Sequence, residues 1–252
     1  MTARLAHIHR HPIKSHGRED LASVTLTAGQ SLPWDRHWAV THAASKWQPD
    51  DPRWMACANF ILGSSIPALM AINATLEEAA GRITLTHPAR DPLSFCPDQP
   101  GDHAAFLAWV APLLGSERQA TALVKAPGRG MTDTDYPSVS IINLASNADL
   151  GLLLDADLSP LRWRGNLWVA GWDPWAEQAL IGRDLRIGEV VLRVVEPIQR
   201  CKATTANPAT GLRDVDTLQG LRSHTGAQNF GVYAEVRTGG SLRPGDQIEV
   251  LA

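Results

Sequence analysis

Residues 194–211, with the sequence VVEPIQRCKATTANPATG, are the stretch that decides both the fold and the chemistry of this chain. They overlap the end of 187–194, a turn followed by a β-branched run that predicts a strand. The Asn-Pro and Thr-Gly pairs near the end of the stretch predict a turn. Between strand and turn, Cys201 lies among polar and basic neighbours, so the sequence places one thiol where a strand ends.

An extended backbone around Cys201 would place Gln199 and Ala203 on the same face as the thiol, and Arg200 and Lys202 on the other face. The two bases would then act on the thiol through the local field, which favours a thiolate without assuring one. The alternative interpretation is a structural thiol, because many cysteines serve only packing.

Further motifs follow Cys201 in a definite order. They are Pro-x-x-Arg-Cys-x-x-Thr-Thr, Asn-Pro-x-Thr-Gly, the pair Leu218 and Leu221, NFGVY at 229–233 and GSLRPGD at 240–246. This order resembles the MOSC domain, the C-terminal domain of molybdenum cofactor sulfurases, in a family that includes the amidoxime-reducing proteins of mitochondria and bacteria. The resemblance implies that Cys201 ligates molybdenum. Many relatives carry another cysteine where this chain has Ile198, so Cys201 would act alone.

The composition is typical of a soluble globular protein. The 252 residues, 44% hydrophobic and 19% charged, suffice for one large β-rich domain or two small ones. A net charge of −3 gives no reason to expect nucleic acid or an anionic membrane as a partner. Any anion site must therefore be a local cluster of bases.

The three cysteines, Cys57, Cys96 and Cys201, are too few and too scattered for a disulfide framework or a four-cysteine iron–sulfur cluster. The first residues show no apolar signal region, and no window approaches about 18 uninterrupted apolar residues. We therefore expect no membrane span and a location in a reducing cytoplasm.

Short β-like runs broken by Gly, Pro and Asp predict a small sheet or barrel in the first part of the chain. The runs are 5–9, 21–27, 37–41, 70–76, 82–86 and 93–95. A helix is predicted at 103–114, with Asp102 as its cap. Beyond it the patterns predict strands at 120–125 and 138–144, a helix at 148–155 capped by Ser146 or Asn147, and a short helix near 217–224.

A second group of residues is similar to the β-barrel domain that precedes MOSC in the amidoxime-reducing group. It consists of HPIKS at 11–15, Gly17 and WDRHWAV at 34–40. Together the two resemblances cover nearly the whole chain and imply a mixed α/β, β-rich fold. The implied domains are a MOSC N-terminal β-barrel-like domain at 1–100 and a MOSC domain at 101–252, with the join within about ten residues of Pro100.

The cofactor that the resemblance implies, a molybdenum–pterin (Mo-molybdopterin), is a bulky anion. A protein that binds it needs cations and hydroxyl or backbone donors for the phosphate, and amides for the pterin. The resemblance places Lys14, Ser15 and Arg36 in the cofactor pocket. Taken alone, Lys14 would be interpreted as an exposed lysine at a strand end, and Arg36 as a surface ion pair with Asp35.

The segment RWRGN at 162–166 is similar to a Phe-Arg-Pro-Asn motif, which implies that Arg164 and Asn166 contact the phosphate and the pterin. Residues two apart on a strand face the same way, and this suits two contacts to one ligand. Gly165 replaces the proline of relatives, so the rigidity of the turn differs. Arg162 is interpreted as a solvated base at a helix end.

The loop before the strand at 138–144 supplies two weaker candidates, Asp135 as a catalytic residue and Ser138 as a cofactor-binding residue, with a register ambiguous by one residue. Glu177 either belongs to a family Pro-aromatic-x-Glu step or is a surface acid. The four tryptophans that precede the cysteine strand either wall the pocket or form a stack of core aromatics. They are Trp163, Trp168, Trp172 and Trp175.

With Cys201 as a metal ligand, the resemblance implies an oxidoreductase that reduces N-hydroxylated small molecules. The chain lacks a Gly-x-Gly-x-x-Gly nucleotide fingerprint and the cysteines of an iron–sulfur cluster, so electrons would come from a separate flavin or iron–sulfur protein. Two alternatives stay open. One is a persulfide sulfur carrier acting at Cys201, and the other is a module that binds or delivers the cofactor without turnover.

Overall fold

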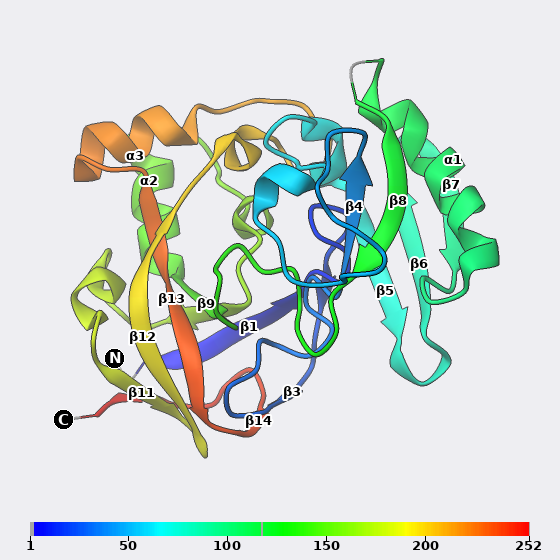
Figure 1. Cartoon of the computed structure of the whole chain (residues 1–252). Coiled ribbons are helices and arrows are strands. Elements are labelled where there is room, and N and C mark those ends of the chain that lie inside the picture. The colour runs from blue at the N-terminus through cyan, green and yellow to red at the C-terminus, as the bar shows by residue number, and fades with distance from the viewer. Residues whose placement is uncertain (1–2, 117, 252) are drawn as a thin grey trace.

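The computed structural model describes residues 3–116 and 118–251, and its largest element is an eight-stranded sheet. The strand order is β15-β11-β12-β13-β9-β10-β1-β2. The strands are β1 (Arg4–Arg10), β2 (Glu19–Asp20), β9 (Val139–Asn143), β10 (Leu167–Ala170), β11 (Asp184–Ile187), β12 (Val190–Gln199), β13 (Asn229–Thr238) and β15 (Ile248–Val250). All neighbours are antiparallel except β9 and β10, and Figure 1 shows β12 and β13 as a long twisted pair.

A second group of strands lies at the opposite side of the molecule, on the right in Figure 1. One sheet joins β5 (Asn73–Glu77), β6 (Arg82–His87) and β7 (Arg90–Phe95), and another pairs β4 (Trp38–His42) with β8 (Ala120–Lys125). Helix α1 (His103–Leu114) covers this group, and the stacked rings of Phe95 and Phe106, 5.1 Å apart, join it to the sheet. The pair of β3 (Val24–Leu26) and β14 (Gly240–Leu242) completes the strands.

Two longer helices accompany the large sheet, α2 (Leu144–Leu153) and α3 (Thr217–Thr225). Seven short 3-10 helices complete the described chain: η1 (Cys57–Asn59), η2 (Pro67–Ala71), η3 (Glu78–Ala80), η4 (Pro100–Asp102), η5 (Pro160–Trp163), η6 (Ala176–Leu180) and η7 (Lys202–Thr205). No helix in the described ranges is both long and apolar enough to cross a bilayer.

The core of the large sheet follows from the alternation in β12. Val190, Leu192 and Val194 are buried while the residues between them are partly exposed, as expected for a strand with one face on the core. This strand leads directly to Cys201, so the packing of its buried apolar face determines the position of the cysteine. The predicted β-rich mixed fold is confirmed.

The two halves of the chain are interlocked. Strand β1, although first in sequence, pairs with β10 in the large sheet, and the chain then crosses to the β4 side. The predicted domain join near Pro100 falls just before α1, whereas β8 beyond it still pairs with β4. That join stays a prediction.

Several predicted elements differ from the structure. Only the second part of the predicted strand at 70–76 is extended, because Pro67 begins the 3-10 helix η2, which runs to Ala71. Helix α2 begins at Leu144 rather than 148, because Asn143 caps it by accepting a bond from Ala145 N at 3.0 Å. Asp102 does not cap α1 with its side chain, which instead accepts a bond from Cys96 N.

The extended backbone predicted around Cys201, with residues 199–203 alternating between two faces, is also wrong beyond the cysteine. The strand ends at Gln199, Cys201 itself is extended, and the next residues form the 3-10 helix η7. Thr204 closes this turn by donating both its N–H and its hydroxyl to Cys201 O, at 3.2 and 3.1 Å. Hydroxyl residues compete well for such local bonds, which explains the early end of the extended backbone.

Candidate functional site

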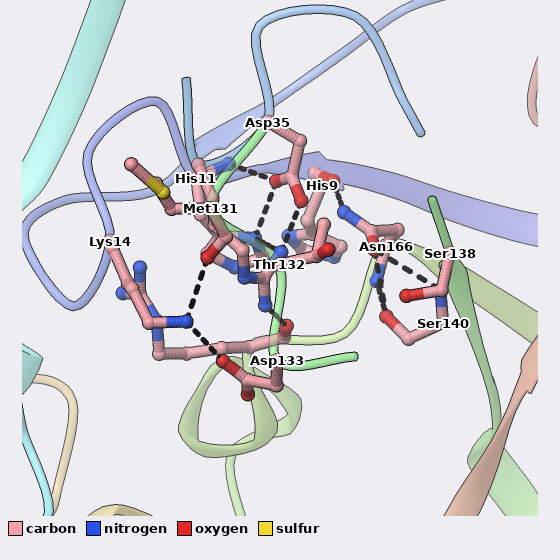
Figure 2. A network of polar contacts seen from close by, with 12 residues as sticks. His9, His11, Lys14, Asp35, Met131, Thr132, Asp133, Ser138, Ser140 and Asn166 are labelled. Atoms are coloured by element: carbon pink, nitrogen blue, oxygen red, sulfur yellow. Dashed lines mark hydrogen bonds and ion pairs between the residues drawn. The ribbon is translucent and has the colours of Figure 1, made fainter. Parts of the chain in front are cut away.

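A cavity of about 520 Å³ lies beside Cys201 where the two halves of the chain meet, and we call it the inner cavity. Both halves contribute to its wall, and Figure 2 shows polar contacts made by some of the wall residues and by residues behind them. Among its lining residues are Lys14, Ser15, Arg36, Cys57, Asp133, Asp135, Arg162, Trp163, Arg164, Arg200 and Cys201. The structure therefore brings together six of the eight predicted site residues, all except Ser138 and Asn166.

Three residues of this wall have a backbone conformation that side chains rarely adopt. The φ angles of Ser15, Arg36 and Arg164 are 62°, 50° and 51°. Left-handed backbone at non-glycine residues costs energy and clusters at functional sites. Three of the six non-glycine residues with positive φ in the described ranges therefore line this one cavity, which favours it as a functional site.

Lys14 is buried, so its interpretation as an exposed lysine is wrong. Its ammonium group donates to Met131 O at 2.7 Å and pairs with the carboxylate of Asp133 (Figure 2). The lysine thereby ties the start of the chain to the 131–133 loop. Because Asp133 compensates its charge, Lys14 contributes less to the positive potential of the cavity than a free lysine would.

Arg36 and Asp35 form a buried ion pair rather than a surface one. Asp35 is 1% exposed and also accepts a bond from His11 N at 2.8 Å. Burial opposes ionisation of this carboxyl group, but Arg36 and the bonds from His11 hold its pKa well below the ordinary value. Arg36 in turn donates to the backbone oxygen of Arg164 at 2.9 Å, so Asp35 orients Arg36 and links it to the Arg164 backbone.

Arg164 and Arg200 supply cations without a carboxylate partner in the described parts of the chain. Arg164 donates to Ile13 O, and Arg200 donates to Phe230 O and Trp163 O at 2.8 and 2.9 Å. One terminal nitrogen of each, Nη1 of Arg164 and Nη2 of Arg200, is buried without a partner within 3–116 and 118–251. Such unmade bonds are costly and point to a missing acceptor.

Both arginines remain positively charged at neutral pH. Burial, reinforced by the nearby Arg36 and Arg18, lowers the pKa of Arg164 to about 9. Burial likewise lowers the pKa of Arg200 to about 10. The inner cavity therefore presents desolvated guanidinium groups, which suits an anion with several oxygen acceptors.

Asn166 and Ser138 lie behind the cavity wall rather than in it. The Asn166 carbonyl oxygen accepts bonds from Ser140 N and Oγ at 3.2 and 2.8 Å, and its amide donates to His9 O at 3.2 Å (Figure 2). Ser138 bonds to the Thr134 hydroxyl at 2.8 Å. The observed contacts of Asn166 hold β1, β9 and β10 together, and direct contact with a cofactor stays a prediction.

Arg162 and Glu177 are buried, which corrects the interpretation of Arg162 as a solvated base and rules out the surface-acid alternative for Glu177. Arg162 donates to Thr204 O at 2.9 Å and pairs with Asp214 at 3.3 Å, so it supports the turn after Cys201. Glu177 accepts a bond from Asn143 at 3.0 Å and others from Ser146 at 2.9 Å.

The tryptophan cluster divides between the two predicted roles. Trp163 lines the inner cavity and stacks on Phe230 with ring centroids 3.9 Å apart. Trp168 is buried in the same apolar cluster, where Trp175 packs at its edge, and Trp172 packs against the core of the large sheet. Only Trp163 of the four therefore walls the pocket.

Cys201 is exposed at the rim of the inner cavity. A second cysteine of the same wall, Cys57, was not predicted, since nothing in its sequence neighbourhood distinguishes it. Its thiol donates to the Asp133 carboxylate at 3.3 Å, and burial together with that carboxylate raises its pKa to about 11. Cys57 is therefore a neutral thiol at ordinary pH.

Gly165, at the position where the resemblance would place a proline, packs closely against Ile142. A Cβ atom there would lie 2.2 Å from Ile142 Cδ1 and 2.8 Å from Ile142 Cγ1. We expect Gly165→Ala to lower the free energy of unfolding by about 1–3 kcal/mol in urea titrations. In an Ile142→Ala background, the same change should lower the free energy of unfolding far less. An equal loss of stability in both backgrounds would contradict this packing argument.

Comparison with known sequences assigns the two halves separately. Residues 131–249 match the sequence model of the MOSC domain, and residues 2–112 match that of the MOSC N-terminal beta barrel domain. The two matches together span nearly all of the chain. It therefore belongs to the MOSC-domain proteins that carry the N-terminal barrel domain.

Two curated relatives illustrate the kinship. The chain is 32% identical over 163 residues to the molybdenum cofactor sulfurase of Drosophila grimshawi, covering 60% of this chain and 21% of that protein. It is 32% identical over 126 residues to human mitochondrial amidoxime reducing component 2, covering 45% of this chain and 37% of that protein. The matches thus span only about a fifth and somewhat over a third of these relatives. A solved structure, the YuaD protein of Bacillus subtilis, aligns over 99% of this chain and 96% of its own, with 14% identity and a TM-score of 0.48.

Proposed function

We propose that this chain binds a molybdenum cofactor in the inner cavity, uses Cys201 as the protein ligand to molybdenum, and reduces N-hydroxylated small molecules. The observation that carries the proposal is the combination, in one cavity, of an exposed cysteine with two arginines whose buried N–H groups lack acceptors in the described chain. Kinship with an amidoxime reducing component supports the choice of reaction.

The lining residues fit such a cofactor chemically. Phosphate and pterin oxygens are acceptors for the N–H bonds that Arg164 and Arg200 leave unmade. Arg36, fixed by Asp35, holds the backbone of Arg164, while Ser15 offers a hydroxyl group on the same wall. When bound, the cofactor supplies two-electron redox chemistry at its metal.

The position of Cys201 suits the proposed reaction. Reduction of an N–OH group to N–H takes up two electrons and two protons and releases water. Because Cys201 lies exposed at the rim, both a small-molecule substrate and an electron donor can approach its end of the cavity. We propose a separate flavin or iron–sulfur protein as that donor.

A sulfur carrier is the second candidate function, and the exposure of Cys201 favours it. An accessible thiolate can hold a persulfide and pass its outer sulfur to an acceptor without a bound pterin. A module that binds or delivers the cofactor without turnover would use the same arginines. Only an activity assay distinguishes such a module from an enzyme.

Metal and pterin analysis of the purified protein tests the proposal. From a host that makes the cofactor, we expect about one molybdenum and one pterin per chain, and lower molybdenum occupancy in Cys201→Ser because the ligand is lost. Full occupancy in Cys201→Ser would contradict a ligand role. Absence of molybdenum together with a persulfide at Cys201, detected by mass spectrometry, would establish the carrier function instead.

A further inference from the structure

A second cavity, of about 960 Å³, adjoins the inner cavity at Cys201, and we call it the outer cavity. The two cavities share Ser64, Gln199, Arg200 and Cys201. The rest of the outer cavity is formed by the segment after Cys201 and by α3, the orange helix in Figure 1. Cys201 thus lies between two spaces, of which the proposed cofactor requires only one.

The outer cavity carries excess positive charge. Its wall contains the cations Arg200, Lys202, Arg213 and Arg222 and the carboxylates Asp214 and Asp216. Both carboxylates are already engaged, because Asp214 pairs with buried Arg162 and Asp216 caps α3 by accepting a bond from Gln219 N at 2.9 Å. Within the part of the chain that the structure describes, none of the four cations forms an ion pair with a carboxylate.

Arg213 is held in place although it is exposed. Its guanidinium group donates to Lys202 O, to the Thr205 hydroxyl, and across to Ser64 O at 2.8 Å. These neutral acceptors orient the side chain and leave its charge uncompensated. An ordered cation loses less conformational entropy when it binds an anion than a free surface side chain does.

The outer cavity also has an apolar part. Leu218, buried on the first turn of α3, and Val215, partly buried before it, belong to its wall. Apolar contact next to fixed charges is the usual composition of a site for a small organic molecule. The wall therefore matches a ligand with an apolar body and an anionic group.

We propose that the outer cavity is the substrate pocket and that it selects N-hydroxylated compounds carrying an anionic group, a carboxylate or a phosphate. Lys202, Arg213 and Arg222 bind this group, while the apolar body lies against Leu218 and the N-hydroxyl end reaches Cys201. The choice of reaction rests on the proposed function, but binding of the anion does not.

Binding is measured on the protein as purified, by calorimetry, with benzamidoxime and 4-carboxybenzamidoxime as a matched pair. We expect the carboxylated probe to bind about tenfold more tightly, and less so at high salt because exposed charges are screened. Competition by benzoate and by phenyl phosphate then separates a carboxylate preference from a phosphate preference. The double variant Lys202→Gln/Arg222→Gln should remove most of the preference for the carboxylated probe.

Arg82→Gln is the control, because it removes one exposed charge from β6, outside the residues that line either cavity. It should retain the preference for the carboxylated probe. Equal binding of the two probes to the wild type, or an undiminished preference in the double variant, would overturn the inference. If the protein binds the carboxylated probe selectively but contains no molybdenum and reduces no substrate, the binding pocket would be supported and the proposed reductase function would be contradicted.

Discussion

Replacing Cys201 by alanine is expected to lower the reduction of an N-hydroxylated substrate by at least about 100-fold per molybdenum retained. Changes in residues that only support a metal ligand already cost about 10–100-fold, and Cys201 is proposed as the ligand itself. Its exposed position, between the inner cavity and the outer cavity, puts the thiol next to both the proposed cofactor and the proposed substrate. Turnover is measured with a chemical reductant, and molybdenum is counted in the same sample.

Arg164→Gln is the matched variant, because it should affect retention rather than chemistry. A charge-assisted bond from arginine to phosphate contributes roughly 1.5–3 kcal/mol, so its loss weakens retention by about one to two powers of ten. Activity should then fall in proportion to molybdenum lost. Undiminished turnover per molybdenum in Cys201→Ala would contradict a catalytic role for Cys201 and support only a cofactor-binding module. Reduced turnover per molybdenum in Arg164→Gln would show that Arg164 takes part in the reaction as well as in cofactor binding.

The family motifs, together with one buried alternation, were sufficient to predict six residues that line the inner cavity, but they also placed Ser138 and Asn166 there, which do not line it. Val190, Leu192 and Val194 identify β12 by their period, and β12 positions Cys201. The family motifs then place Lys14 and Arg164 on the same cavity, as the structure does.

The sequence was not sufficient to predict how buried these residues are, because burial depends on partners far along the chain. Lys14 pairs with a carboxylate 119 residues away, and Arg162 with one 52 residues away. No local pattern marks such pairs. Cys57 was missed for the same reason, since its hydrogen bond joins positions 76 residues apart.

The buried Asp35 carboxylate leads to the prediction with the largest effect on stability. Asp35→Asn keeps an oxygen that can accept the bond from His11 N but removes the charge that compensates Arg36. Removing one partner of a buried ion pair leaves the other charge uncompensated, which costs about 3–5 kcal/mol. We expect a loss of about 3 kcal/mol in the free energy of unfolding at pH 7, measured by urea titration.

The pH dependence distinguishes the lost charge from a general packing defect. The folded-state pKa of Asp35 lies well below that of an unfolded aspartate, about 3.9, so its stabilisation is present above that pH and is lost as the pH falls further. The stability difference between wild type and Asp35→Asn should therefore be constant from pH 7 to about 5 and shrink below about pH 4. Glu249→Gln, which breaks the exposed pair with Arg186, should leave stability nearly unchanged throughout. A difference that stays constant to pH 2 would show that shape, and not the charge of Asp35, holds the arginines of the inner cavity in place.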